Sequence, residues 1–451
     1  MNSKEIIIKS IEGKRQLVFA AEKYLVAHAA SGYREQESSE YLATKFIELG
    51  YEVKSAGNIP GFIADLDSGK AGPLLCIMAE LDSLIVPEHP EAVAATGAAH
   101  ACGHHTECAA ILAVAAALKE KDVLSQLSGK VRFAIVPAEE LIEIEYREGL
   151  RKAGAISYFS GKVEFLHRGL LDGVQLAFMV HSSSNCPGGF AISRGNNGCI
   201  TKSLTYSGKS SHAGSAPHLG INALYAAEIG MSAVNALRET FKEKDYIRVH
   251  PIITSGGSAV NAIPSKVKVE SFVRAAEVET MQKENKKINR AFAAGAVAIG
   301  AQLHINDRFG YMPLRNDETM AEIAASCMAE VVGPENVKTD AAWSTGSTDM
   351  GDLSTQMPIL HPYVGGATGT PHGSDYLITD GETAIVKNAI FQALFAYELL
   401  KDEAVLAQKV IANKKVIFNS KEEYFETIKN FTMEKDVVSY EANGQIIIDL
   451  E

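Results

Sequence analysis

Three short apolar runs in this chain each end at residues whose side chains can bind cations or transfer protons. The runs cover residues 74–79, 131–136 and 174–180. The residues that follow them are Glu80 and Asp82, Glu139 and Glu140, and His181. Continuous apolar runs of this length are typical of strands buried on both faces of a sheet. The carboxyl ends of parallel strands meet at one edge, where ligands bind in open sheets.

The segment between the first two runs has the composition of a helix. Residues 106–119 are rich in alanine and leucine, which predicts a helix of about four turns. Strands that alternate with helices predict an α/β fold, with a mostly parallel sheet flanked by helices. The carboxylates and the histidine would then gather at one edge of that sheet.

The middle of the chain has another pattern. Period-two alternation at 200–206 and 267–273 predicts half-exposed strands, and residues 222–238 and 284–299 are typical of helices. This pattern predicts a smaller α+β unit with an antiparallel sheet, inserted into the first domain. The predicted bounds are 1–195 with 309–451 for the larger domain and 196–308 for the inserted one. The tail after Lys401 gives no indication of a role.

Charge and composition exclude several classes of partner. The 451 residues include 55 acidic and 43 basic ones, and the formal charge of −12 repels a phosphate backbone. No apolar run reaches the roughly 18 residues of a membrane span, and the charged N-terminus lacks a signal-peptide pattern. Six scattered cysteines predict reduced thiols rather than a disulfide framework. We therefore expect a cytoplasmic protein that binds neither nucleic acid nor a membrane.

The loop before the alanine-rich helix is dense in potential metal ligands. Residues 100–105 are HACGHH, and thiolate and imidazole are ligands that zinc prefers. Gly103 gives the backbone the freedom to turn Cys102 and His104 toward one point. A buried free cysteine beside histidines that cap the helix is the alternative interpretation.

Glu139 and Glu140 follow a strand that Pro137 interrupts. One carboxylate could bind a metal while the other takes a proton from metal-bound water, as a metallohydrolase requires. The alternative is an acidic helix N-terminus stabilised by the helix dipole. His181 could be a core histidine with satisfied hydrogen bonds, but its place at the same sheet edge favours a ligand.

Two other enzyme classes are not supported. Residues 208–212 resemble the end of a phosphate-binding loop, but Ser203 stands where the first glycine of that motif is required. No serine has glycines two residues before and after it, as a nucleophile elbow requires.

Six stretches of the chain, in this order, resemble a known group of enzymes. They are MAELDSL at 78–84, HACGHH at 100–105, PAEE at 137–140, the strand that ends in His181, HAGSAPHLGINA at 212–223 and SAVNAIPSKVKVESFVR at 258–274. With them the chain resembles the metal-dependent amidohydrolases of the aminoacylase and glutamate-carboxypeptidase superfamily. The most similar branch contains aminobenzoyl-glutamate hydrolase, hippurate hydrolase and the auxin-conjugate hydrolases of plants.

The resemblance implies a centre with two divalent metal ions, zinc or manganese, in the larger, catalytic domain. The implied metal ligands are Cys102, His104, Glu140, His181 and His372. Glu139 would act as general base and then as general acid. The partner subunit's His212 would stabilise the oxyanion, so the inserted domain would form a homodimer. Asn261 and Arg274 would bind the carboxylate of the substrate.

Two of these assignments have competitors. Arg274 shares a strand face with charged residues, so a solvated face is an alternative to substrate binding; these residues are Lys266, Lys268 and Glu270. His361 competes with His372 for the last ligand position.

The sequence also departs from the pattern that it resembles. The branch usually has an aspartate after the ligand histidine and a histidine two positions later, where this chain has His105 and Glu107. Glu80 and Asp82 stand where the wider superfamily has a His-x-Asp pair. These changes leave the roles of His105, Glu107 and Glu80 open.

Together these features predict metal-dependent hydrolysis of an amide bond. The expected substrates are N-acyl amino acids, conjugates similar to aminobenzoyl-glutamate, or small peptides. The alternatives are a dipeptidase or carboxypeptidase, and a non-catalytic homologue that keeps the metal and binds a ligand.

Overall fold

The computed structural model describes residues 2–340 and 342–450 and divides the chain into two compact units. The first unit comprises Met1–Gly195, Arg315–Trp343 and Asp352–Lys421. The second comprises Asn196–Leu314, Ser344–Gly351 and Glu422–Glu451. The sequence analysis assigned all of 309–451 to the larger domain, and the structure differs there because the last segment pairs with strands of the second unit.

The first unit is built on a six-stranded sheet with helices packed against it, so a mixed α/β fold is confirmed. In spatial order the strands are β1 (Val53–Ser55), β2 (Phe62–Asp67), β6 (Lys130–Val136), β3 (Leu74–Glu80), β7 (Leu176–Phe178) and β19 (Ile359–Leu360). The four strands from β6 to β19 run parallel, and β1 and β2 pair antiparallel at the other edge. The apolar runs predicted at 74–79 and 131–136 are two central strands of this sheet.

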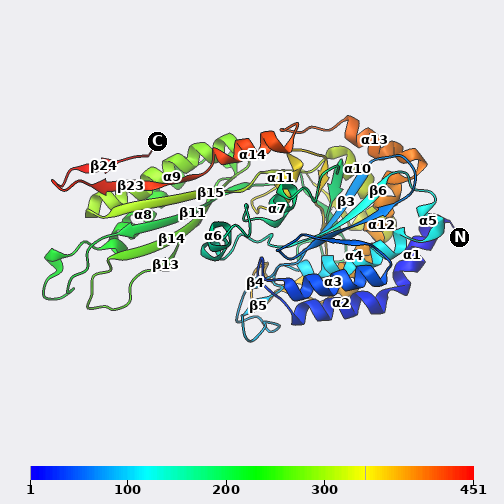
Figure 1. Cartoon of the computed structure of the whole chain (residues 1–451), viewed down its shortest axis with the longest axis horizontal. Coiled ribbons are helices and arrows are strands. Elements are labelled where there is room, and N and C mark those ends of the chain that lie inside the picture. Colours follow the sequence, from blue (N-terminus) through cyan, green and yellow to red (C-terminus); the bar gives the residue numbers. More distant parts are fainter. Residues whose placement is uncertain (1, 341, 451) are drawn as a thin grey trace. The chain divides into compact units, whose positions relative to one another are not determined.

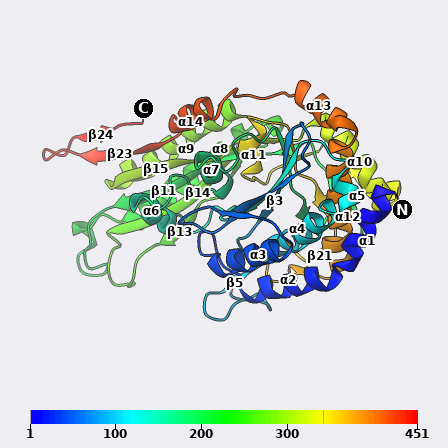
Figure 2. The same ribbon diagram turned by 45° about the vertical axis from the view of Figure 1, so that its right-hand side comes forward.

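Helix α4 (His104–Leu118) is the central helix of the first unit. It packs against β3, α1 (Ser3–Gly13), α2 (Arg15–Ala27) and α12 (Asn388–Leu400), as Figures 1 and 2 show. Its many alanines permit close approach of these neighbours on every side. In the described ranges, no helix is long and apolar enough to cross a membrane.

Further helices and short strands complete the first unit. The helices are α3 (Gln36–Glu48), α5 (Lys121–Leu124), α6 (Ile144–Lys152), α7 (Gly161–His167), α10 (Glu318–Val332) and α13 (Val405–Ala412). A four-stranded sheet contains β17 (Val337–Thr339), β9 (Phe190–Ile192), β20 (Tyr363–Val364) and β8 (His181–Ser182). The predicted run 174–180 is therefore shorter as a strand, and the histidine after it begins a strand in a different sheet.

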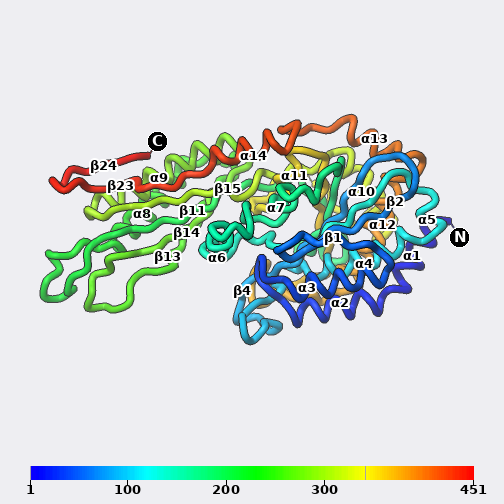
Figure 3. Tube along the Cα trace, viewed as in Figure 1, coloured from blue at the N-terminus to red at the C-terminus, as the bar shows by residue number. Residues whose placement is uncertain are grey.

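The second unit contains a seven-stranded antiparallel sheet. Its strands are β12 (Arg248–Val249), β13 (Ile252–Ser255), β14 (Lys266–Ala275), β11 (Gly198–Ser207), β15 (Gln302–Tyr311), β23 (Met433–Tyr440) and β24 (Ile446–Ile448). Helices α8 (Ala223–Leu237) and α9 (Val278–Ile299) pack against β11 and β14. Figure 3 shows the red C-terminal segment beside β15, where β23 extends the sheet.

Candidate metal centre

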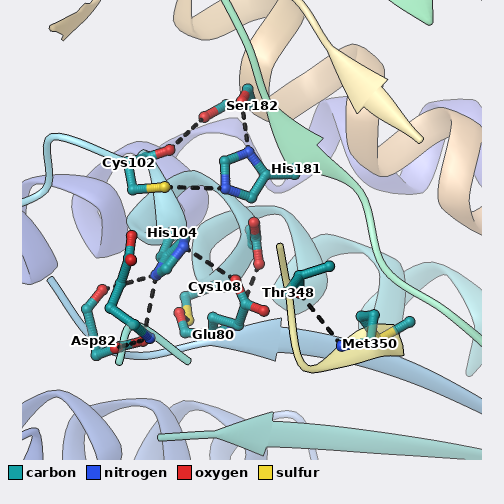
Figure 4. A network of polar contacts seen from close by, with 12 residues as sticks. Glu80, Asp82, Cys102, His104, Cys108, His181, Ser182, Thr348 and Met350 are labelled. Atoms are coloured by element: carbon teal, nitrogen blue, oxygen red, sulfur yellow. Dashed lines mark hydrogen bonds and ion pairs between the residues drawn. The ribbon is translucent and has the colours of Figure 1, made fainter. Parts of the chain in front are cut away.

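Cys102 and His104 meet the histidine of β8 at the start of α4. Gly103 between them has φ +95°, and a Cβ there would lie 1.9 Å from the Ser182 hydroxyl oxygen. Only glycine permits this approach. Cys102 Sγ therefore lies 3.2 Å from His181 Nε2 (Figure 4). A thiol and two imidazoles thus converge at the carboxyl side of the parallel strands.

His104 is fully buried and held from one side by Asp82. Its Nδ1 lies 2.9 Å from the Asp82 carbonyl oxygen and 3.4 Å from Oδ1 of the same residue. With Nδ1–H as the donor, Nε2 is the atom left to bind a cation. Burial lowers the pKa of His104, but Glu80 and Cys102 raise it by more, so it lies well above the usual value. The surroundings of this imidazole therefore favour positive charge.

The strand β6 ends in a turn that orients the two adjacent glutamates. The residue after Pro137, Ala138, has φ +57°, and its N–H donates to Glu35 Oε1 at 2.8 Å. The buried Arg147 donates to the Ala138 carbonyl oxygen at 3.4 Å, which fixes the turn from its other side. The break in the strand was predicted at Pro137, and the residue with left-handed backbone conformation lies one position later, at Ala138. This turn replaces the opposite-facing arrangement of an extended strand.

Glu140 and His372 lie together beside Cys102. The Glu140 N–H donates to Asp82 Oδ2 at 2.9 Å, and Glu140 Oε1 lies 3.3 Å from His372 Nε2. The loop of His372 is tied down by a bond from its N–H to the Ala101 carbonyl oxygen, at 3.0 Å. The side chain of His372 is about half exposed, at 52%, whereas His104 is fully buried.

Two groups of three metal-binding side chains share one cysteine. Cys102, His104 and His181 form the first group, and Cys102, Glu140 and His372 form the second. Within each group the ligand atoms all lie within 4.8 Å of one another. The five ligands implied by the resemblance are the five members of these groups.

The donor set fits divalent cations. Within the described ranges, the buried His104 Nε2 and Glu140 Oε1 have no hydrogen-bond partner. Buried polar atoms are normally paired, so such atoms point to a ligand. Burial also raises the pKa of the Cys102 thiol well above its usual value, and a bound cation would be needed to hold it as thiolate. Sulfur, nitrogen and oxygen donors together suit zinc and similar borderline cations.

Glu139 lies next to these groups, and His361 does not join them. The ligand atoms of Glu139, His104 and Glu140 lie within 4.8 Å of one another, and Glu139 is only 6% exposed. The ring centroid of His361 lies 5.9 Å from that of His181, but among the described residues it belongs to no such group. The structure therefore brings His372, rather than His361, to Cys102 and Glu140.

His212 and Asn261 lie together in the second unit, and both are exposed. His212 Nδ1 accepts hydrogen bonds from the N–H groups of Gly214 and Ser215, each at 3.1 Å. Nε2 is then the ring atom that carries the proton of the neutral imidazole. The Asn261 carbonyl oxygen accepts from the Ala213 N–H at 2.9 Å, which joins the two loops.

Arg274 lies on the less buried face of β14, as its strand parity indicates. Val273 and Ala275 on either side of it are fully buried. The guanidinium lies 5.2 Å from the centroid of the Phe272 ring and 3.3 Å from the Ser347 hydroxyl oxygen. Both contacts leave donors of the guanidinium for another group.

Lys162 was not among the predicted site residues, and Glu107 had no predicted role. Lys162 of α7 is fully buried and pairs with Glu80, and Glu107 Oε2 accepts from the Glu80 N–H at 3.2 Å. Burial raises the pKa of Glu80, but Lys162 and His104 lower it by more, to about 2. A single lysine in a short amphipathic segment gives no signal that distinguishes it from a surface lysine.

Two candidate groups of metal ligands thus share Cys102, with the carboxylate of Glu139 beside them. Residues 76–396 match the family described as peptidase family M20/M25/M40. The chain belongs to this family, which confirms the resemblance to metal-dependent amidohydrolases and peptidases.

Known relatives differ in what they are named for. The chain is 30% identical to Xaa-Arg dipeptidase of Mus musculus over 58% of this chain and 57% of that protein. It is 26% identical to N-acetyl-L-cysteine deacetylase of Bacillus subtilis over 82% of this chain and 86% of that protein. A dinuclear metal-binding M20 peptidase of Bacillus subtilis shares the fold, with a TM-score of 0.63 at 22% identity, over 86% of this chain and 99% of that one.

Proposed function

We propose that this protein hydrolyses the amide bond of an N-acyl amino acid, of a conjugate similar to aminobenzoyl-glutamate, or of a small peptide. The observation that carries the proposal is the pair of three-ligand groups that share Cys102, with Glu139 beside them. The two divalent ions would be zinc or manganese. Cys102, His104 and His181 would hold one ion, and Cys102 with Glu140 and His372 would hold the other.

Bound cations would polarise the amide carbonyl and lower the pKa of water. Glu139 would take the proton of the attacking water through a carboxylate oxygen and pass it to the departing amine nitrogen. Glu139 is buried, which restricts competing solvent, and one of its carboxylate oxygens lies within 4.8 Å of ligand atoms of His104 and Glu140. His212 would donate its Nε2–H to the oxyanion, and one such donor typically contributes about 2.7–4 kcal/mol. Asn261 and Arg274 would bind the substrate carboxylate.

A homodimer is part of this proposal, since the partner subunit's His212 would complete each site. The second unit supports it with exposed apolar side chains on one strand and one helix. Ile252 and Ile253 of β13 are 49% and 38% exposed, and Tyr225 and Ile229 of α8 are 56% and 39% exposed. Exposed apolar groups on a short strand are typical of surfaces that pair with another chain.

The dimer is tested with Ile252→Lys, which places a charge on the exposed strand. We expect a monomer by light scattering, with the metal content of the wild-type protein and strongly reduced turnover. The exposed Ile47→Lys in the first unit is the matched control and should remain dimeric. A fully active monomer would contradict the cross-subunit role of His212.

We also infer a cytoplasmic location, which the six cysteines support. All six are buried thiols in the structure, and Cys102 needs its thiol for metal binding. Cell fractionation tests this inference, and recovery only outside the cytoplasm would contradict it.

The variant Glu139→Gln tests the reaction. It should keep the fold and both cations, because the carboxylate and carboxamide side chains have nearly the same shape, yet lose about 10²–10⁴-fold in turnover. Turnover is measured on N-acyl amino acids, aminobenzoyl-glutamate and dipeptides with zinc, manganese or cobalt. The exposed Glu37→Gln is the matched control and should behave as wild type. Wild-type rates in Glu139→Gln would exclude Glu139 as the proton carrier.

The same panel separates the two substrate classes that the relatives suggest. Similarity to the dipeptidase favours small peptides, and the longer match to the deacetylase favours N-acyl amino acids. Failure to hydrolyse any member while both cations are bound would favour a binding protein that has kept the metal.

A further inference from the structure

His104 and His181 belong to a second set of donors besides the one that contains Cys102. Together with Glu80 and Glu107 they form a buried group whose ligand atoms lie within 4.8 Å of one another. His104 and His181 each have only Nε2 left for a metal, because Nδ1 is hydrogen-bonded to a carbonyl oxygen, and the first proposed ion would occupy both Nε2 atoms. A further divalent cation such as manganese would therefore bind the carboxylates of Glu80 and Glu107, which we call the carboxylate set. The centre therefore has a sulfur set and a carboxylate set of ligands around the same two histidines.

The carboxylate set is incomplete as a hydrogen-bond network. Glu80 Oε2 lies within ion-pair distance of His104 Nε2, at 3.0 Å, and within the described ranges neither atom has a hydrogen-bond partner. The same holds for Glu107 Oε1 in the described part of the chain, and Glu107 is only 1% exposed. Buried polar atoms left in this way have the capacity to bind a cation.

Lys162 brings a positive charge to this set. Its ammonium contacts Glu80 Oε1, and both side chains are buried, at 0% and 1% exposed. A lysine ammonium is a compact point charge. In a buried environment it repels a nearby divalent ion far more strongly than it would in water.

We propose that the ammonium group of Lys162 takes the place of a further metal ion beside the carboxylate set. It thereby limits the centre to the two metal ions that share Cys102. The inference rests on the proposed two-cation centre and names the residue that sets its stoichiometry. Lys162 is a positioning residue here, because it acts through Glu80 rather than on the substrate. Glu107 and Glu80 are the ligands that a further ion would gain in its absence.

The test is a gain of metal binding in Lys162→Met. Purified full-length protein is dialysed to equilibrium against excess Mn²⁺, and bound manganese is measured by elemental analysis. We expect two ions per chain in the wild-type protein and three in Lys162→Met. The third ion should be lost again in Lys162→Met combined with Glu107→Gln.

Two further variants control for charge and folding. Lys162→Arg keeps the positive charge and should bind two ions. Lys162→Gln removes the charge but keeps an N–H donor for Glu80, so it should bind three ions even if the methionine variant does not fold. Circular dichroism of each variant checks the fold.

The outcomes distinguish this inference from the proposed function. Two ions in the wild-type protein and two in folded Lys162→Gln would overturn the role of Lys162 alone. No bound ion in the wild-type protein would overturn the two-cation centre and this inference with it.

Discussion

The two units of the molecule each bury a lysine beside a carboxylate, and the two pairs differ in what completes them. In the second unit, Lys202 contacts both Asp307 Oδ1 and Asn289 Oδ1. Asp307 Oδ2 accepts further bonds from the side-chain amides of Asn285 and Asn289, at 2.7 and 2.8 Å. Both charged groups of this pair therefore have hydrogen-bond partners within the protein itself.

The buried lysine of the first unit, Lys162, lies in a different environment. Lys162 pairs with Glu80 Oε1, but within the described residues Glu80 Oε2 and the facing His104 Nε2 remain without hydrogen-bond partners. A buried ion pair whose groups are all satisfied serves the fold, whereas unpaired buried donors and acceptors mark a place for a ligand.

The largest effect is expected from removing the shared ligand of the metal centre. Cys102→Ala should lose both cations, because the thiolate belongs to both three-ligand groups, and turnover should fall by about 10³-fold or more. Metal analysis and kinetics check this. Cys327→Ala removes another buried thiol of the first unit and should keep both cations. Retention of two cations by Cys102→Ala would show that the thiolate is not shared.

The structural pair should respond in stability rather than in metal content. Lys202→Met leaves the Asp307 carboxylate buried without its charge partner, which typically costs about 3–5 kcal/mol. Urea unfolding measures the loss, and metal analysis should still give two ions per chain. In the matched double variant with Asp307→Leu, only part of the stability should return, because the side-chain amides of Asn285 and Asn289 lose their acceptor. Loss of metal in Lys202→Met would contradict the purely structural role of the Lys202–Asp307 pair.

Removing the metal should affect only the first unit. A ligand present at 100 times its Kd stabilises the folded state by about 2.7 kcal/mol, and a chelator removes that contribution. Hydrogen exchange should therefore speed up at the N-terminal end of α4 and in β8, and stay unchanged in β11 and β15. Equal changes in both units would contradict a centre confined to the first.

The smallest effect is expected from Asp82→Asn. Residues that orient a metal ligand typically contribute 10–100-fold to affinity, and here we expect about tenfold, because the Asp82 carbonyl oxygen still holds His104. Competition with a chelator measures the affinity. Asp67→Asn, at an exposed position, is the control and should leave it unchanged. A loss of both cations in Asp82→Asn would make the side chain a ligand in its own right.

The strands that carry the metal centre could be predicted because their signal is local. The apolar runs became β3 and β6, and the alanine-rich segment became α4, with the first histidine ligand at its start. The pairing of β23 with β15 could not be predicted, since Met433 lies opposite Asp307 across a long stretch of chain. Nothing in the composition of the tail indicates that partner, and only the main-chain hydrogen bonds reveal it.

The site could be predicted for the residues that follow strands and not for those that approach from elsewhere. The position of Glu140 and His181 after an apolar run indicates that they lie at the edge of the sheet where ligands bind. Lys162 enters from a short helix between strands, so its role depends on burial against Glu80, which no local pattern encodes. For the same reason, no local pattern indicates whether Glu107 binds a cation.

The most direct test of the shared-cysteine centre is a titration of metal-free protein with Co²⁺, followed by the thiolate-to-metal absorption band. The account predicts a band that grows until two ions are bound per chain, and its absence in Cys102→Ala. A wild-type protein that binds cobalt without a thiolate band, or saturates with fewer than two ions, would contradict it.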